Sequence, residues 1–180
     1  MRRLFVSNMV SLDGFFEGAH KELDWHTADE EFFGYAKEML RSVDTILFGR
    51  KTYQLMAAYW PSAAEDEIAD KMNNLPKIVF SRTLKKVGWK NSRLISGEAS
   101  AEISRLKQQP GRDMVILGSA SLAAPLLQQG LIDEYRVIVS PVLIGSGNPL
   151  FPRITQRLKL TLKQTKVLGS GTVILYYQKG

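Results

Sequence analysis

Short apolar segments that alternate with helix-like segments constrain this chain more than any other feature. Short, largely apolar runs occur at residues 45–48, 78–80 and 114–117. Strands this apolar are typical of a parallel sheet that is covered on both faces. Segments with apolar residues at helical spacing lie between them, as in residues 32–40. The alternation predicts an α/β fold with helices on both faces of a mostly parallel central sheet.

The C-terminal part of the chain departs from this alternation. Residues 158–162 alternate leucine with polar residues and predict a half-exposed strand, and residues 173–177 predict a second strand. No helix is expected between these two, so they would form an antiparallel edge of the sheet. No composition shift marks a linker, and we expect a single domain over residues 1–180.

Further elements are predicted from strand, cap and turn signals. Strands are expected at 4–10 and 135–139, and helices at 99–108 and 121–129, with Pro125 confined to a first turn. Capping-box patterns at 27–30 and 62–65 predict two helix starts, the first with Thr27 as N-cap. Asp133 and Glu134, at a strand start, are expected to face solvent or an interface.

Composition excludes several kinds of site. The chain has no cysteine, which excludes disulfides, thiolate metal sites and cysteine nucleophiles. Its two histidines, His20 and His26, form no H-x-x-x-H pattern. The net charge of +6 suits polyanions or simply solubility, but the cations are spread along the chain, which disfavours nucleic-acid binding. Neither a signal peptide nor an apolar run of about 18 residues is present, so we expect a cytoplasmic protein without membrane contact.

Small and cationic residues follow three of the predicted strands. The sequences are FGRKT at 48–52, FSRT at 80–83 and LGSAS at 117–121. Carboxyl ends of parallel strands share one edge, where α/β proteins bind ligands. A helix starting after each strand would present free N–H groups to a phosphate, and Arg50, Lys51 and Arg82 would add charge. The alternative is an ordinary helix start. The P-loop, G-x-G-x-x-G and G-x-S-x-G motifs are absent.

A set of short motifs, in order over nearly the whole chain, resembles the dihydrofolate-reductase-like family that includes the C-terminal reductase domain of the bifunctional riboflavin-biosynthesis deaminase–reductase. The motifs are SLDG at 11–14, GRKTY at 49–53, YWP at 59–61, SRTL at 81–84, GSASL at 118–122, LIDE at 131–134 and PVLIGSG at 141–147. The resemblance is greatest to the stand-alone bacterial members, and no deaminase zinc motif is present. It implies a three-layer dihydrofolate-reductase-like fold.

The resemblance also implies an NADPH site at the strand-end edge. By analogy, residues around the pyrophosphate, the adenosine 2′-phosphate and the nicotinamide would be Val10, Ser11, Gly49, Arg50, Lys51, Thr52, Ser81, Arg82, Gly118, Ser119, Ala120, Ser121 and Leu122. Three cations near the adenosine end favour NADPH over NADH, because the additional phosphate needs charge-assisted partners.

The substrate side is less defined by the resemblance. Asp13 and Asp29 are the candidate proton donors, with Asp24, Glu30 or water as alternatives. Structural roles compete with catalysis: a turn for Asp13, the first helical turn for Asp29 and the capping box for Glu30. Candidate substrate contacts are Asp13, Gly14, Phe15, Phe16, Trp25, Tyr53 and Trp60, although core packing is the alternative for the aromatic residues. Lys21 and Arg153 are candidates for binding a substrate phosphate.

These expectations define the principal functional hypothesis. It is an NADPH-dependent reductase that transfers hydride to a pteridine- or pyrimidine-type heterocycle, similar either to 5-amino-6-(5-phosphoribosylamino)uracil reductase or to dihydrofolate reductase. The alternative is a non-catalytic nucleotide- or flavin-binding module on the same fold. The resemblance further suggests a homodimer formed over the C-terminal sheet edge.

Overall fold

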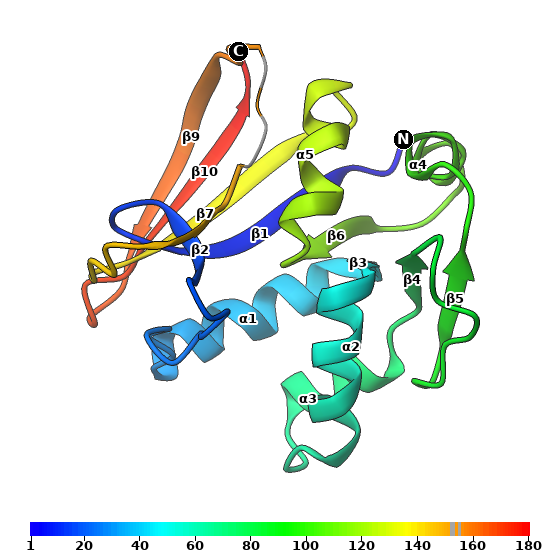
Figure 1. The fold of residues 1–180 in the computed structure, drawn as a ribbon, viewed down its shortest axis with the longest axis horizontal. Coiled ribbons are helices and arrows are strands. Elements are labelled where there is room, and N and C mark those ends of the chain that lie inside the picture. Colours follow the sequence, from blue (N-terminus) through cyan, green and yellow to red (C-terminus); the bar gives the residue numbers. More distant parts are fainter. Residues whose placement is uncertain (152–153, 155) are drawn as a thin grey trace.

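The chain folds around one large sheet (Figure 1). The structure is a computed structural model, and it describes residues 1–151, 154 and 156–180. Its strands are β1 (Leu4–Ser11), β2 (Phe15–Gly18), β3 (Val43–Gly49), β4 (Lys77–Phe80), β5 (Ser92–Ile95), β6 (Asp113–Leu117), β7 (Glu134–Ser140), β8 (Gly147–Pro149), β9 (Leu160–Val167) and β10 (Val173–Lys179). Its helices are α1 (Glu30–Ser42), α2 (Arg50–Tyr59), α3 (Glu67–Asn74), α4 (Ala99–Lys107) and α5 (Ala120–Gln128), with a 3-10 turn at Trp60–Ser62.

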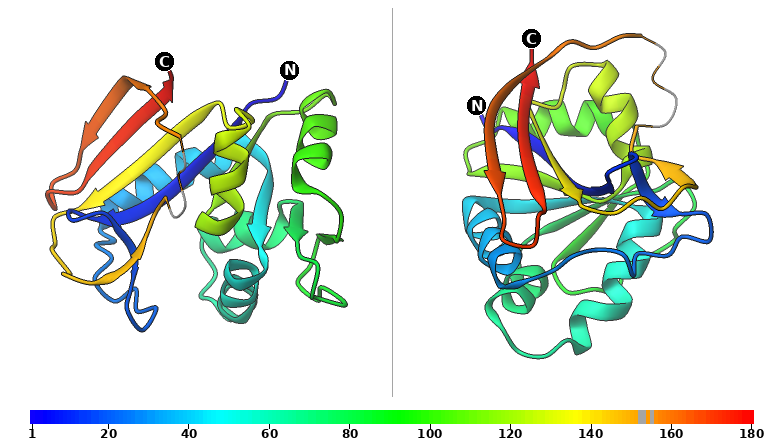
Figure 2. Two further views of the ribbon diagram at one scale, coloured as in Figure 1. Left: turned by 45° about the horizontal axis from the view of Figure 1, so that its top comes forward. Right: turned by 90° about the vertical axis from the view of Figure 1, so that its left-hand side faces the viewer.

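The strand order confirms the predicted mixed sheet. The eight strands of the main sheet run β5-β4-β3-β6-β1-β7-β10-β9. Every pair from β5 to β7 is parallel. Only the C-terminal strand β10 reverses direction, because it pairs antiparallel with both β7 and β9. Figure 2 shows the β9–β10 hairpin at one edge of the molecule.

Helices cover both faces of the sheet, as predicted. On one face, residues of α1, α2 and α3 pack with Phe5 and Met9 of β1. On the other, residues of α4 and α5 pack with Leu4 and Val6 of the same strand. Successive side chains of a strand point to opposite faces, so one apolar strand supplies both cores. Figure 1 shows the two groups of helices on opposite sides of the sheet.

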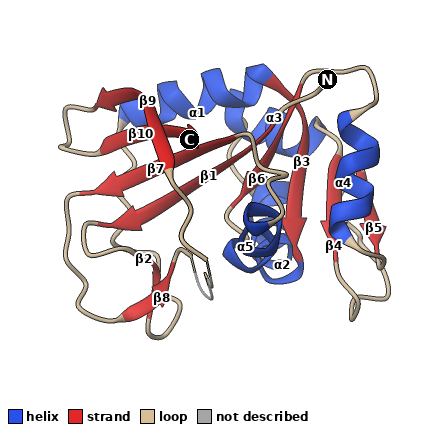
Figure 3. Cartoon of the chain, turned by 90° about the horizontal axis from the view of Figure 1, so that it is seen from above, coloured by secondary structure: helices blue, strands red, loops and turns tan. Residues whose placement is uncertain are grey.

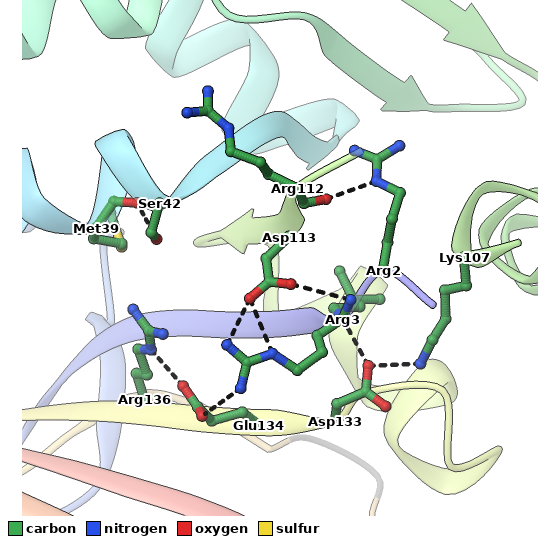
Figure 4. Close-up of polar contacts among 11 residues, drawn as sticks. Arg2, Arg3, Met39, Ser42, Lys107, Arg112, Asp113, Asp133, Glu134 and Arg136 are labelled. Carbon is green, nitrogen blue, oxygen red and sulfur yellow. Dashed lines mark hydrogen bonds and ion pairs between the residues drawn. The ribbon is translucent and has the colours of Figure 1, made fainter. Parts of the chain in front are cut away.

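The amino end of β1 is held by ion pairs (Figure 4). Arg3 pairs with Asp113 of β6 at 2.6 Å, and Asp133 binds Lys107 of α4 at 2.6 Å. Glu134 pairs with Arg136 at 2.6 Å and is only 9% exposed. The expectation that Asp133 and Glu134 face solvent or an interface is therefore wrong for Glu134. The strand register places it beside β1, where neighbouring basic residues neutralise its charge.

Two helices begin later than the capping patterns predict. Asp29, not Thr27, caps α1 by accepting a hydrogen bond from the Phe32 N–H at 2.8 Å. Asp66 caps α3 in the same way, with the Ala69 N–H at 2.7 Å. In both cases a carboxylate sits at the N-cap, where its charge interacts favourably with the helix dipole as well as with the free amides. The Ser62 prediction is wrong because that residue ends the 3-10 turn.

Three other local predictions differ from the structure. No helix follows Ser81, because the chain continues as a loop toward β5. Pro125 lies beyond the first turn of α5, so position 125 cannot donate to the Ser121 carbonyl. The strands β2, β5 and β8 were not predicted; β5 joins the main sheet beside β4, whereas β2 and β8 pair antiparallel in a small second sheet. Figure 3 shows these two strands beside each other and apart from the main sheet.

Candidate functional site

The three predicted strand ends do lie together. Strands β4, β3 and β6 are consecutive and parallel in the sheet, and Gly49 at the end of β3 pairs with Phe80 at the end of β4. Helix α2 leaves β3 toward one face, whereas α5 leaves β6 toward the other. Neighbouring strands that send their chains to opposite faces create a topological switch point, which is the usual ligand crevice of an open α/β sheet.

Ser119 joins the starts of α2 and α5. Its hydroxyl accepts a hydrogen bond from the Gly49 N–H at 2.9 Å, and its own N–H donates to the Thr52 hydroxyl at 3.0 Å. Ser119 adopts the left-handed conformation, with φ 54°. The preceding Gly118 also has positive φ, and a Cβ there would lie 2.9 Å from the Thr52 methyl. Close contact of the two helix starts therefore depends on glycine at 118.

Neither of these helix N-termini is closed by a side chain. Helices α2 and α5 have no side-chain cap, whereas α1 and α3 are capped by Asp29 and Asp66. The first N–H groups of a helix have no partner within the helix, and together with the dipole they favour an anion. Lys51 lies in the first turn of α2 and adds a full positive charge.

A cleft of about 1030 Å³ opens beside this junction. Its volume is at the upper end of ordinary ligand sites. Helices α2 and α5 line it on two sides, with β1, β2, β8 and the loop after β2 completing it. Six of the predicted cofactor residues are among the described residues that line the cleft: Lys51, Thr52, Gly118, Ser119, Ala120 and Ser121.

The other predicted cofactor residues lie around the cleft and do not line it. Arg50 and Arg82 are exposed at the ends of β3 and β4. The Ser81 hydroxyl accepts hydrogen bonds from the backbone of Thr83 and Leu84, and Gly49 contacts Ser119. The remaining three predicted cofactor residues have structural roles. Val10 and Leu122 are core residues, and the buried Ser11 hydroxyl accepts a hydrogen bond from the Phe15 N–H across the turn.

Both candidate proton donors are engaged as hydrogen-bond acceptors. The Asp13 carboxylate accepts from the backbone N–H groups of Gly145 at 2.8 Å and Ile144 at 3.3 Å. A hydrogen bond with Ser11, together with these backbone bonds, lowers the pKa of Asp13. The N-cap bond from Phe32 likewise lowers the pKa of Asp29. A carboxyl with a lowered pKa is a poorer proton donor near neutral pH.

The aromatic candidates are divided between cleft and core. Phe16 lines the cleft, and Phe15 is half-buried on β2 beside the positive-φ turn at Gly14. Tyr53 is in the core, where its hydroxyl accepts from the N–H groups of Gly88 and Trp89.

The two tryptophans among these candidates are half-buried. Trp60 packs against Tyr59 and donates to the Met56 sulfur at 3.2 Å. Trp25 packs edge-on against His26, with ring centroids 4.4 Å apart. Neither tryptophan is among the described residues that line the cleft, whereas His26 is. Asp24 is exposed on the same loop.

Several cleft residues were not singled out from the sequence. Glu17 is the one carboxylate among the described lining residues, and it accepts a hydrogen bond from the Asn148 side chain at 2.8 Å. His26 also lines the cleft, and burial lowers its pKa. Lys21, a candidate for binding a substrate phosphate, lines the cleft too, whereas Arg153 lies outside the described residues. Glu17 and Asn148 meet only through the β2–β8 pairing, so no local pattern indicates them.

Fold and cleft together define a protein of the dihydrofolate-reductase-like class. The family model for the RibD C-terminal domain matches residues 2–174, and the chain belongs to this family. A curated relative, the uncharacterized protein YyaP of Bacillus subtilis, is 36% identical over 99% of this chain and 96% of its own length. Membership of the family indicates a reductase of the riboflavin-biosynthesis type.

Solved structures support the same fold. A putative riboflavin biosynthesis protein from Shewanella sp. PV-4 matches with a TM-score of 0.79 and 22% identity over 99% of both chains. A diaminohydroxyphosphoribosylaminopyrimidine deaminase/5-amino-6-(5-phosphoribosylamino)uracil reductase from Thermotoga maritima matches with a TM-score of 0.72 and 12% identity, over 99% of this chain and 57% of that one. At these identities the likeness establishes the fold alone. In the described part of the chain, no helix is long and apolar enough to cross a membrane.

Proposed function

We propose that this protein is an NADPH-dependent reductase that transfers hydride to a pteridine- or pyrimidine-type heterocycle. The observation that carries the proposal is the junction of α2 and α5 at Ser119, where two helix N-termini without side-chain caps meet at one cleft. Two adjoining anion sites suit a pyrophosphate. The reductase family to which the chain belongs supplies the reaction class.

The residues present fit such a dinucleotide. Gly118 lets the starts of α2 and α5 approach each other at the cleft, because a Cβ there would lie 2.9 Å from the Thr52 methyl. The amides at the start of α5, in Ala120 and Ser121, would hold the pyrophosphate, and Lys51 would bind a phosphate oxygen. Arg50 and Arg82 stand at adjacent strand ends and would bind the 2′-phosphate. The cofactor, when bound, supplies the hydride, whereas the protein supplies placement and a proton.

Glu17 is the residue we assign to proton delivery. Addition of hydride to the carbon of a ring C=N double bond needs a proton at the ring nitrogen, and the donor must lie within hydrogen-bond reach of that nitrogen. Glu17 lines the cleft, and the hydrogen bond from Asn148 orients its carboxyl. Asp13 and Asp29 remain predicted donors, but their oxygens already accept backbone hydrogen bonds that hold the fold together.

Titration calorimetry with NADPH and NADH tests the cofactor assignment. We expect the wild type to bind NADPH more tightly than NADH. Lys51→Ala should weaken NADPH binding about tenfold or more, since a charge-assisted bond contributes about 1.5–3 kcal/mol. Lys163→Ala is the matched control, because Lys163 is an exposed lysine on β9. If both variants weaken NADPH binding equally, net charge causes the effect, and the assignment of Lys51 is contradicted.

The second candidate is a nucleotide- or flavin-binding module without catalysis. The engagement of Asp13 and Asp29 in structural hydrogen bonds favours it. Stopped-flow measurement of NADPH oxidation with pteridine and pyrimidine acceptors separates the two functions. Binding of FMN or NADPH without turnover of any acceptor would support the module.

A homodimer over the C-terminal edge also remains a proposal. Strand β9 is the last strand of the sheet order, and it exposes Leu162 and Val167. Unpaired edge strands offer N–H and C=O groups to a second chain. Sedimentation velocity should give a dimer mass, and Leu162→Lys should shift the protein toward monomer. A monomeric wild type would contradict the proposal.

A further inference from the structure

The chain between β4 and β5 forms a basic loop, residues 81–90, beside the proposed cofactor site. The loop contains no Asp or Glu but four cations: Arg82, Lys85, Lys86 and Lys90. The first three are exposed, and none of them forms an ion pair with a described residue. Arg93, on the strand that follows, is by contrast paired with Glu102 at 2.6 Å. Cations gathered without counter-charges repel one another and attract an anion.

Two side-chain hydroxyls hold the basic loop, one near each end. The Ser81 hydroxyl accepts a hydrogen bond from the Leu84 N–H at 3.0 Å, which closes the first turn of the loop. The Tyr53 hydroxyl of α2 accepts hydrogen bonds from the N–H groups of Gly88 at 3.1 Å and Trp89 at 3.0 Å. The exposed cations lie between these two points. The position of the loop relative to α2 therefore depends on the Tyr53 hydroxyl.

Tyr53 joins two basic segments through a single helix. Its ring is in the core, 5% exposed and with its centroid 6.2 Å from that of Trp89, so only the hydroxyl serves the loop. Arg50 lies one turn earlier on α2, directly after Gly49, and Gly49 pairs with Phe80 at the start of the basic loop. Phenylalanine would fill the same space in the core, so apolar packing does not explain the hydroxyl at position 53.

We propose that Tyr53 is a positioning residue that gives the site its preference for a nucleotide with a ribose 2′-phosphate. Its hydroxyl holds the basic loop against α2, so that Arg82 stays beside Arg50 at the adjoining strand end. A phosphate dianion is bound most strongly when charge-assisted donors are already in place. Tyr53 itself touches no part of the nucleotide. The inference rests on the proposed function for the cofactor, but binding of a 2′-phosphate requires neither nicotinamide nor hydride transfer.

Calorimetric titration with adenosine 2′,5′-bisphosphate and with 5′-AMP tests the inference, because the two nucleotides differ only in the 2′-phosphate. Wild type should bind the bisphosphate about tenfold or more tightly than 5′-AMP. Tyr53→Phe should remove most of this preference and leave the affinity for 5′-AMP unchanged. Tyr35→Phe is the matched control, since Tyr35 is 3% exposed and its hydroxyl bonds the Ser7 hydroxyl at 3.1 Å, away from the basic loop. It should keep the wild-type preference.

A double-mutant cycle with Arg82→Ala separates positioning from a merely structural role. Arg82→Ala alone should lower the preference for the bisphosphate. Tyr53→Phe should then lower it little further in the Arg82→Ala background, because the hydroxyl acts through the loop that carries Arg82. A structural role of Tyr53 would weaken both nucleotides by the same factor, and that result would overturn the inference. So would effects of the two substitutions that multiply as if independent.

Hydrogen exchange of the wild type gives a measurement that needs no variant to fold. The bisphosphate should slow exchange of the Gly88 and Trp89 amides more than 5′-AMP does, because it holds the loop closed on the Tyr53 hydroxyl. Equal effects of the two nucleotides, or a wild type without preference, would contradict the inference. If Tyr53→Phe removes the preference but NADPH reduces no acceptor, the proposed function fails and the inference stands. If NADPH is oxidised and Tyr53→Phe keeps the preference, the inference fails and the proposed function stands.

Discussion

The hydroxyl of Ser119 accepts a hydrogen bond from the backbone N–H of Gly49 at 2.9 Å. Together with the bond from the Ser119 N–H to the Thr52 hydroxyl, this contact holds the start of α5 against the start of α2, although the two helices follow different strands. The proposed pyrophosphate site exists only while both helix starts face the same cleft. The geometry of binding is therefore set by a side chain that need not touch the ligand.

Ser119→Ala should weaken nucleotide binding and destabilise the protein by about 1 kcal/mol, because the Gly49 N–H loses its acceptor. Urea unfolding gives the stability, and calorimetry gives the NADPH affinity. Ser104→Ala is the control, since Ser104 is exposed on α4 and is not among the described residues that line the cleft. If Ser119→Ala leaves both quantities at the wild-type values, the junction does not organise the site.

Gly118→Ala should cost about 1–3 kcal/mol of stability, since Gly118 has φ +60° and a Cβ would lie 2.9 Å from the Thr52 methyl. We also expect NADPH binding to be lost. Gly34→Ala is a matched control inside α1, where a Cβ meets nothing within 4 Å. It should stabilise the protein by about 0.5–1 kcal/mol. Similar effects of the two substitutions on urea unfolding would refute the steric argument.

Glu17→Gln should lower kcat by about 10²–10⁴-fold and leave the Kd for NADPH unchanged, because the amide keeps the shape of the side chain but cannot deliver a proton. Asp13→Asn should instead lower stability through the loop between β7 and β8 that contains Ile144 and Gly145, with a smaller effect on kcat. Single-turnover kinetics with an acceptor identified by screening distinguishes the two residues. A larger loss of kcat in Asp13→Asn than in Glu17→Gln would identify Asp13 as the proton donor.

Asp29 should behave as a helix cap in its pH dependence. Its folded-state pKa is lowered from the ordinary value of 3.8, first by the Phe32 N–H and then by the Ser170 hydroxyl. A lowered carboxyl pKa means that the unfolded chain binds the proton more tightly. The stabilisation is therefore fully present above about pH 4 and is lost as pH falls through the folded-state pKa.

Asp29→Ala should destabilise the protein at pH 7 and flatten the acid limb of the unfolding curve, while Asp29→Asn keeps most of the cap. Both variants should retain wild-type kcat. Unfolding by urea at pH 7 and at pH 3 measures the cap, and a loss of kcat in Asp29→Asn at unchanged stability would show a catalytic carboxyl instead.

The fold was predictable because its strands are nearly uninterrupted apolar runs. Residues 45–48 and 114–117 lie inside β3 and β6, which are buried on both faces. Parallel strands that end in glycine then place Gly49 and Gly118 on one edge, so the position of the cleft followed from the sequence as well. The pairing of Leu47 with Ile116 and the hydrogen bond between Gly49 and Ser119 confirm that geometry.

The inner wall of the cleft was not predictable, for two physical reasons. Glu17 and Asn148 lie on strands that are far apart in the sequence but pair in the fold, and no local pattern encodes such a contact. Asn8, which also lines the cleft, carried a usable signal, a polar residue in a strand expected to be covered on both faces. The predicted start of α1 was wrong for a different reason. Thr27 and Asp29 both suit an N-cap, and in the structure the carboxylate of Asp29 takes that position.

Thermal unfolding of the wild-type protein with NADPH, NADH and FMN tests the proposed NADPH site without any substitution. At about 100 times Kd, binding to the folded protein adds about 2.7 kcal/mol, which raises the midpoint by roughly 5–11 °C for a chain of this size. We expect a rise with NADPH that exceeds the rise with NADH, and none of comparable size with FMN. No rise with either nicotinamide nucleotide would contradict the proposed site, and a rise with FMN alone would assign the cleft to a flavin.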